Sequence, residues 1–238
     1  MQNVLNIALR QFRAYFNGPV AYIVAIIMLG VVGFMFWLFF FVQGVATIHE
    51  MINWMGYVMV VAIPALTMGL IAEEKSSGTV EILLTMPVKD HEVILGKYLG
   101  ALGLFLVIVL LTLVNPIAVS QFGDLDWGPV ATGYLGLILE GMAMLALGLM
   151  ASSWTKNQLV AFFISLFMLA IVGWLIPAAA RFMATGWVAN TLEVISFSHH
   201  LESMARGVID SRDVLFFLSL TVLGLVVSFQ SIESRRWG

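Results

Sequence analysis

Six apolar stretches, each long enough to cross a lipid bilayer, constrain the fold of this sequence most strongly. They cover about residues 19–42, 54–72, 98–120, 129–151, 159–177 and 214–230. A spanning helix needs ~20 mostly apolar residues, because each residue rises ~1.5 Å through a hydrocarbon core ~30 Å thick. The alternating pattern of barrel strands is absent, and lipid cannot satisfy an open backbone. The sequence therefore predicts an all-α integral membrane protein, with six transmembrane helices in a single domain over residues 1–238.

Composition agrees with a chain that is solvated by lipid. Apolar residues make up 61% of the sequence and charged residues 11%, whereas a soluble domain has roughly 45–50% and ~25%. The net charge of −3 gives no footprint for binding nucleic acid, which needs clustered Lys and Arg. The chain contains no cysteine, which excludes disulfides, thiolate metal sites and cysteine nucleophiles.

The basic residues divide unequally between the two sides that six crossings define. One side holds Arg10, Arg13, Lys75, Lys89, Lys97, Lys156, Arg235 and Arg236. The other side holds Arg181, Arg206 and Arg212. Because cytoplasmic loops carry the excess of Lys and Arg, this asymmetry predicts that both termini and residues 73–97 are cytoplasmic.

Three segments do not have the pattern of a simple span. Residues 3–16 alternate apolar and polar faces at helical spacing, which predicts an amphipathic helix in the cytoplasmic interface. An ordinary soluble lead-in helix is the alternative. Residues 73–97 are charged but punctuated by apolar side chains. Residues 178–212 are too polar to span, and their mixed composition predicts short helices that dip into the outer leaflet or cap a cavity.

The cytoplasmic segment carries an ordered set of residues. These are Glu73, Glu74, Gly78, Thr79, Glu81, Leu83, Leu84 and Pro87, followed by the pair Gly96-Lys97. This order resembles the loop between the second and third spans of ABC-2-type transporter permeases. Residues 151–158 resemble the loop between spans four and five of that family, and residues 196–213 resemble its outer segment before span six. Within the family, the sequence is most similar to the gliding-motility (Gld-like) branch, with nitrous-oxide-reductase-maturation permeases as relatives.

The resemblance implies the membrane (permease) subunit of an ATP-binding-cassette machine in the inner, cytoplasmic membrane of a bacterium. Such a subunit dimerises, as a homodimer or with a second permease, and binds two copies of a separate cytoplasmic ATPase. ATP hydrolysis then drives export or transmits force, in some relatives to a periplasmic or membrane auxiliary protein. The 73–97 segment would form a coupling helix that docks on the ATPase, and the eight motif residues from Glu73 to Pro87 are the predicted coupling site.

The residues themselves are compatible with such a helix. Thr79 or Ser76 has the side chain of a helix cap, and Pro87 would end the helix. Leu83 and Leu84 then offer a small apolar patch flanked by charges, which suits a helix-in-groove contact. A solvated loop whose apolar residues rest on the membrane is the alternative.

No motif in the sequence supports chemistry by the chain itself. There is no phosphate-binding GxxxxGK[ST] loop, so ATP and its magnesium are expected on the partner ATPase, and we expect no cofactor and no enzyme activity here. The pairs His49-Glu50 and His91-Glu92 lack the second histidine of a zinc-protease motif. Adjacent His199 and His200 make a poor chelate on a helix, so no metal site is predicted.

Glu140 is the one ionisable residue near the middle of a predicted span. A carboxylate at that depth costs a few kcal/mol, so the default interpretation is a side chain that faces a cavity or a neighbouring helix. A role in substrate passage or subunit pairing is one hypothesis, and a hydrogen-bonded residue inside the bundle is the other. Two further functions stay open for the whole chain: a membrane anchor or scaffold without transport, and a secondary transporter.

Overall fold

The computed structural model describes residues 2–43, 47–78, 89–182 and 186–233, and all regular structure in these ranges is helical. The helices are α1 (Gln2–Asn17), α2 (Pro19–Gln43), α3 (His49–Thr67), α4 (Ala72–Ser76), α6 (Asp90–Thr112), α7 (Val114–Val119), α8 (Trp127–Trp154), α9 (Gln158–Ala170), the π-helix η1 (Ile171–Leu175), α10 (Ile176–Phe182), α11 (Trp187–Ile195), α12 (Phe197–Ala205) and α13 (Ser211–Glu233).

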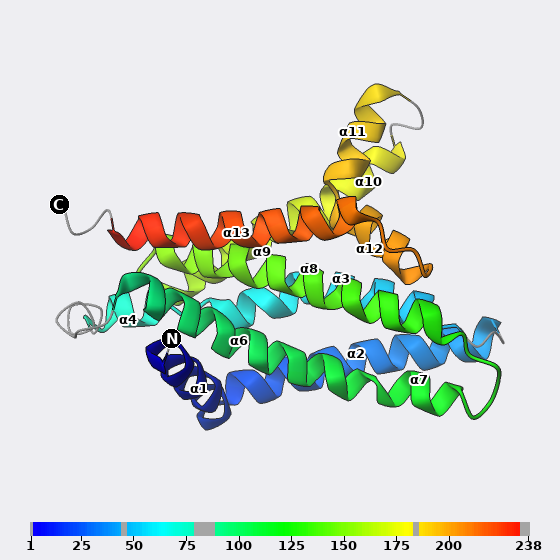
Figure 1. Cartoon of the computed structure of the whole chain (residues 1–238), viewed down its shortest axis with the longest axis horizontal. Coiled ribbons are helices and arrows are strands. Elements are labelled where there is room, and N and C mark those ends of the chain that lie inside the picture. Colours follow the sequence, from blue (N-terminus) through cyan, green and yellow to red (C-terminus); the bar gives the residue numbers. More distant parts are fainter. Residues whose placement is uncertain (1, 44–46, 79–88, 183–185, 234–238) are drawn as a thin grey trace.

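Six helical stretches of the described chain are long and apolar enough to cross a membrane, which confirms the predicted fold class. They are Pro19–Val42, His49–Ser76, Asp90–Val119, Trp127–Trp154, Gln158–Phe182 and Ser211–Glu233. The long helices run side by side along the bundle (Figure 1). We call the end that holds α1, α4 and the last residues of α8 the α1 end, and the opposite end the α12 end. The described stretches of both termini lie toward the α1 end (Figure 1).

Several helices extend beyond the predicted spans. The third spanning stretch begins at Asp90, so residues 90–97 of the predicted 73–97 connection are the first turns of α6. There the Glu92 carboxylate accepts hydrogen bonds from the backbone N–H of Lys89 and from the amide of Asn3, each at 3.2 Å. Likewise, α10 continues to Phe182 and α13 begins at Ser211, inside the predicted 178–212 segment. Hydropathy alone assigns such residues to loops.

Short polar side chains mark where several helices begin. Asp126 precedes α8 and accepts a hydrogen bond from the N–H of Gly128 at 2.9 Å. Asn157 does the same for Leu159 at the start of α9, also at 2.9 Å. Ser196 accepts from the N–H of His199 at 3.3 Å and begins α12. Each cap satisfies a backbone donor that the first turn of a helix leaves open.

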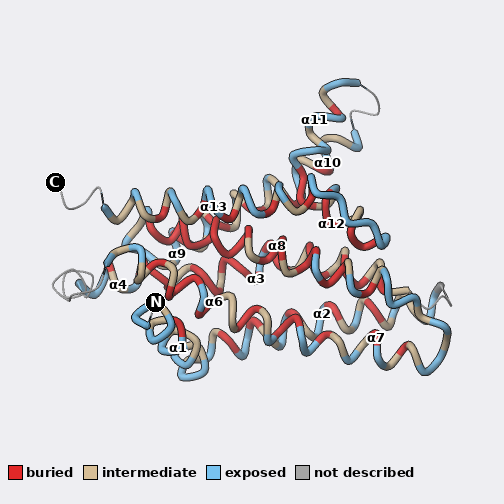
Figure 2. The backbone as a smooth tube through the Cα atoms, viewed as in Figure 1, coloured by how far each residue is buried: buried red, intermediate tan, exposed pale blue. Residues whose placement is uncertain are grey.

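α8 is the central helix of the bundle. In its most apolar stretch 83% of the residues are buried, against 22% in the corresponding stretch of α2. Figure 2 shows the same contrast between the buried α8 and α3 and the half-exposed helices around them. Glycines allow this packing: a Cβ on Gly141 would lie 2.2 Å from the Phe105 ring, and one on Gly224 would lie 2.7 Å from the backbone of Ala146. The outward faces of the other helices are therefore left for lipid or partner chains.

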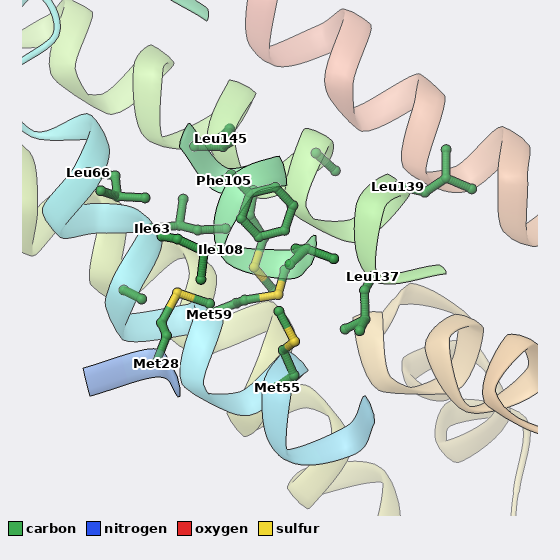
Figure 3. Close-up of a cluster of buried hydrophobic side chains, with 14 of the residues drawn as sticks. Met28, Met55, Met59, Ile63, Leu66, Phe105, Ile108, Leu137, Leu139 and Leu145 are labelled. Carbon is green, nitrogen blue, oxygen red and sulfur yellow. The ribbon is translucent and has the colours of Figure 1, made fainter. Parts of the chain in front are cut away.

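The apolar core lies where α2, α3, α6 and α8 meet. Figure 3 shows Met28, Met55, Met59, Phe105 and Leu145 converging there. All five side chains are fully buried. Methionine side chains are flexible and fill irregular gaps. They therefore suit a core in which side chains from four helices meet.

Two parts of the chain lie outside the bundle of long helices. α1 packs across α6 at the α1 end, while Leu5 and Leu9 on its other side are 60% and 47% exposed. α10 and α11 form a hairpin that projects from the bundle (Figure 1). Its side chains Phe182 and Trp187 are 90% and 81% exposed. Apolar surface of this kind indicates contact with lipid or with another chain.

Candidate functional site

The described part of the predicted coupling segment begins with α4. A serine of α8 holds the first residues of α4 in place. Ser152 is fully buried near the last turn of α8. Its hydroxyl accepts hydrogen bonds from the N–H groups of Ile71 and Ala72, both at 3.1 Å. It donates to the carbonyl of Met68 at 3.0 Å. One hydroxyl thus uses its donor and both acceptor positions to join the end of α3 and the start of α4 to α8.

A lysine from α4 makes a second connection to the same end of α8. Lys75 is 7% exposed, and its ammonium donates to the carbonyl of Ser153. The same carbonyl accepts a hydrogen bond from the hydroxyl of Ser231 on α13, at 2.9 Å. The last carbonyl groups of α8 have no partner within their own helix, so side chains from α4 and α13 supply donors.

A second buried lysine joins α4 to α6. Lys97 is 5% exposed, and its Nζ lies 2.8 Å from a carboxylate oxygen of Glu74. It also donates to the carbonyl of Leu70. A buried ammonium is costly unless it is paired and hydrogen-bonded, and both conditions are met here. The hydroxyl of Ser152 and the two lysines, with their partners, are called the α4 clamp below.

α1 covers the α4 clamp from the side of α6. A Cβ on Gly100 would lie 2.8 Å from the carbonyl oxygen of Ala8, so this glycine lets the backbones of α1 and α6 approach closely. The hydroxyl of Tyr15 donates to the carbonyl of Leu66 at 2.7 Å, which ties α1 to the end of α3 as well. Burial raises the pKa of Tyr15, so its hydroxyl keeps the proton that makes this bond.

A cavity of about 580 Å³ lies beside the α4 clamp, between α1, α3, α4, α6 and α9. Its polar lining includes Arg10, Tyr15, Glu73, Glu74, Lys97 and Gln158. The two acids belong to the motif that the sequence singled out, so movement of α4 would change the shape of this cavity.

The structure describes three of the eight predicted coupling residues. Glu74 faces Lys97, Glu73 lines the cavity, and Gly78 is exposed with a φ of 73°. A positive φ is readily adopted only by glycine, which accounts for Gly78 at the turn that follows α4. Thr79, Glu81, Leu83, Leu84 and Pro87 lie outside the described residues. Ser76, considered as a cap, is instead the last residue of α4, and its hydroxyl donates to the carbonyl of Glu73.

Sequence reasoning did not select the residues that hold the α4 clamp together. Lys75 and Lys97 enter the sequence argument as basic residues of one side, Lys97 also as part of a Gly-Lys pair, and Ser152 and Ser153 fall within residues 151–158, which carry only a family resemblance. Their partners are distant along the chain: 81 residues separate Ile71 from Ser152, and 78 separate Lys75 from Ser153. The available signal was the presence of charged and hydroxyl side chains at the very ends of apolar stretches.

Glu140 lies far from the α4 clamp, half-way along α8. Its side chain is 2% exposed, and its Oε2 atom has no hydrogen-bond partner in the described part of the chain. The structure therefore gives this oxygen no place in a closed hydrogen-bond network, which was one of the two expectations for the residue. It borders a small cavity that also touches Asn53, Tyr57 and Ser198.

The histidine pair at the α12 end is engaged within the protein. Nδ1 of His200 lies 2.6 Å from Oδ1 of Asp213, and its Nε2 lies 2.8 Å from the carbonyl oxygen of Val194. The ring also stacks on Phe216. Both ring nitrogens are thus used to join α11, α12 and α13. Among the described residues no cluster of three or more His, Asp or Glu side chains could hold a metal ion.

Comparison with known proteins identifies one matching family. Residues 47–229, which include α4, four complete spanning stretches and most of the last one, match the model of a family described as ABC-2 family transporter protein. No curated protein sequence matches the chain.

Proposed function

The chain belongs to the ABC-2 transporter family, and we propose that it is the membrane subunit of a machine driven by a separate cytoplasmic ATPase. The α4 clamp is the observation that carries this proposal. α4 opens the segment expected to dock on the ATPase, and Ser152, Lys75 and Lys97 tie it to α8 and α6 through buried polar contacts. A displacement of the segment would therefore move the central helix of the bundle.

The docking element of this proposal is the segment that follows α4. Leu83 and Leu84 would enter a groove on the ATPase, and Glu81 with the neighbouring charges would set the orientation. The rigid attachment of α4 supports this role, because a coupling element transmits force only when its base is fixed. ATP and magnesium would be bound by the partner, and this chain would catalyse no reaction itself.

The topology proposed for this machine puts the α1 end in the cytoplasm. Arg10, Lys75, Lys97 and Lys156 belong to this end, whereas Arg206 belongs to the α12 end, and an excess of basic residues marks the cytoplasmic side. We place the protein in the cytoplasmic (inner) membrane of a bacterium. Two permease copies, most simply a homodimer, would bind two ATPase copies, and a periplasmic or membrane auxiliary protein would join them in a force-transmitting version.

The work performed is export or force transmission across the membrane. Exposed apolar side chains on the α10–α11 hairpin, such as Phe182 and Trp187, favour a contact with lipid or another chain at the α12 end. A movement of α8 reaches this region through α12, which packs on α8. The Gld-like branch, in which force transmission is one of the implied roles, is the closer affiliation that we propose.

Co-purification from the native membrane tests the proposal. The chain is solubilised gently, captured by a tag, and every accompanying protein is identified. We expect a stoichiometric soluble protein with a phosphate-binding loop. Leu83→Asp should release it, because a charge in an apolar groove costs more than the contact gains. Asn6→Asp provides a control, since it adds the same charge at an exposed polar residue of α1.

Recovery of the chain without any ATPase, while other membrane complexes stay intact, would contradict the proposal. Retention of the ATPase by the Leu83→Asp chain would retain the family role but place docking elsewhere.

A further inference from the structure

A small polar cavity beside Glu140 has the properties of a binding site. Its volume is about 20 Å³, and it is lined from α3 by Asn53, Gly56 and Tyr57 and from α12 by Ser198. About 10–15 Å³ is enough for one water molecule, provided that two to four polar groups surround it. The Glu140 carboxyl, with Asn53, Tyr57 and Ser198, supplies such groups. The cavity is therefore large and polar enough for a single water.

Gly56 has no side chain, and this leaves room for the carboxyl group of Glu140. A Cβ on Gly56 would lie 3.2 Å from Oε2 of Glu140 and 2.8 Å from a methyl carbon of Leu201. With alanine at this position, either the carboxyl group or Leu201 would have to shift. The absence of a side chain at Gly56 thus leaves space beside Glu140, which lies half-way along α8.

The charge state of Glu140 follows from what surrounds it. In the described part of the chain no Lys, Arg or His lines the cavity, and none of the ion pairs involves Glu140. Tyr57 is the other titratable residue in the lining. An ionised carboxylate buried without a counter-charge is unfavourable, so such a group takes up a proton instead.

We propose that Glu140 and the cavity beside it form a proton-binding site, in which the neutral carboxylic acid is hydrogen-bonded to one buried water that exchanges with solution at the α12 end. Asn53 and Ser198 line the cavity and are only half-buried, so the route would run past these two residues. When the acid ionises, its proton passes to the water and leaves by this route, and a negative charge stays between α8, α3 and α12. Neither the family match nor the proposed ATPase coupling assigns such a site.

Infrared difference spectroscopy tests the site directly. The full chain, with any protein that co-purifies, is placed in nanodiscs of native lipid and labelled with ¹³C in the carboxyl group of glutamate. We expect a carbonyl band of a protonated carboxylic acid at neutral pH that shifts with the label, which separates Glu140 from Asp213. The band should shift again in D₂O, because the proton exchanges with water.

Two variants assign the band. Glu140→Gln should remove it, and Glu193→Gln, a change at an exposed glutamate of α11, should leave it intact. Ser198→Ala keeps the carboxyl group but removes one partner of the water, so the band should move in frequency. This variant keeps the proposal testable if Glu140→Gln does not fold.

Three results would overturn the proposal. No labelled acid band at neutral pH would mean that Glu140 is ionised. A band that emerges only after sodium and potassium are removed would make the cavity a cation site. A band that does not respond to D₂O would show that the site does not exchange with solution.

Discussion

The buried polar groups at the α1 end and those at the middle of α8 are satisfied in opposite ways. At the α1 end, Lys75 and Lys97 are buried as cations, and carbonyl or carboxylate oxygens accept their hydrogen bonds. At mid-bundle, Glu140 is buried equally deeply, but its Oε2 has no partner in the described residues. The first region is a closed network of charges and hydrogen bonds. The second has a buried carboxyl group beside a small cavity.

This difference teaches what each region can do. A network of buried, hydrogen-bonded charges resists movement, because a displaced group would be left unsatisfied in a medium of low polarity. It is suited to transmit a displacement of α4 to α8 as a rigid unit. A carboxyl group next to a water-sized space can gain or lose a proton without breaking such a network. It is suited to respond to its surroundings.

The largest effect is expected when the α4 clamp loses a cation. Lys97→Met should lower the free energy of unfolding by about 3 kcal/mol, because breaking a buried ion pair costs about 3–5 kcal/mol and Glu74 is partly exposed. Denaturant titration in micelles measures it. Adding Glu74→Gln should restore part of the loss, since the double variant also removes the charge that Lys97 balanced. A loss below about 1 kcal/mol would mean that the pair is solvated like a surface pair.

Removing the shared hydroxyl should have the next largest effect. Ser152→Ala leaves the N–H groups of Ile71 and Ala72 without an acceptor, which should cost about 2 kcal/mol in the same titration. Ser120→Ala is the control, because that hydroxyl is exposed and donates only to the carbonyl of Ile117. Equal stability of the two variants would argue against a fixed α4.

A substitution in the contact between α1 and α6 should lower the free energy of unfolding less. Gly100→Ala places a methyl group 2.8 Å from the carbonyl oxygen of Ala8, and the expected net loss is about 1 kcal/mol from overpacking. Gly30→Ala on α2 meets nothing within 4 Å, so the helix propensity of alanine should make it neutral or slightly stabilising. If both variants behaved alike in the unfolding titration, α1 would not be seated on α6 as described.

The smallest effect is expected at mid-bundle. Glu140→Gln replaces a neutral acid by a neutral amide of nearly the same shape, so the free energy of unfolding at neutral pH should change by less than about 0.5 kcal/mol. The difference between the losses of unfolding free energy for Lys97→Met and Glu140→Gln tests the contrast between the two regions most clearly. A loss of several kcal/mol for Glu140→Gln would mean that the carboxyl group is ionised and has a strong partner.

The sequence predicted the fold class because the bilayer imposes a simple rule on length and polarity. That rule identified the six spans but not their bounds. Asp90, Glu92 and Lys97 lie in the first turns of α6, where hydropathy placed a loop. Glu92 accepts a hydrogen bond from Asn3 and Lys97 pairs with Glu74, both on other helices, and no local property of residues 90–97 indicates these partners.

The candidate site was predicted in part. The motif directed attention to Glu73 and Glu74, and the mid-span position singled out Glu140. The roles of Lys75 and Ser152 depend on contacts between the start of α4 and the end of α8, which are separated in the sequence by 78 and 81 residues. The space beside Glu140 depends in the same way on Gly56 and Leu201 from two other helices.

ATP hydrolysis by the reconstituted complex tests most directly whether α4 couples this chain to an ATPase. The co-purified ATPase is assayed in nanodiscs with the wild-type chain, with Lys97→Met and with the control Gly30→Ala, and its binding is quantified in each sample. We predict that the wild-type and control chains stimulate hydrolysis equally. Lys97→Met should bind the ATPase yet leave hydrolysis close to the rate of the ATPase alone. Full stimulation by a folded Lys97→Met chain, or no stimulation by the wild-type chain, would contradict coupling through the α4 clamp.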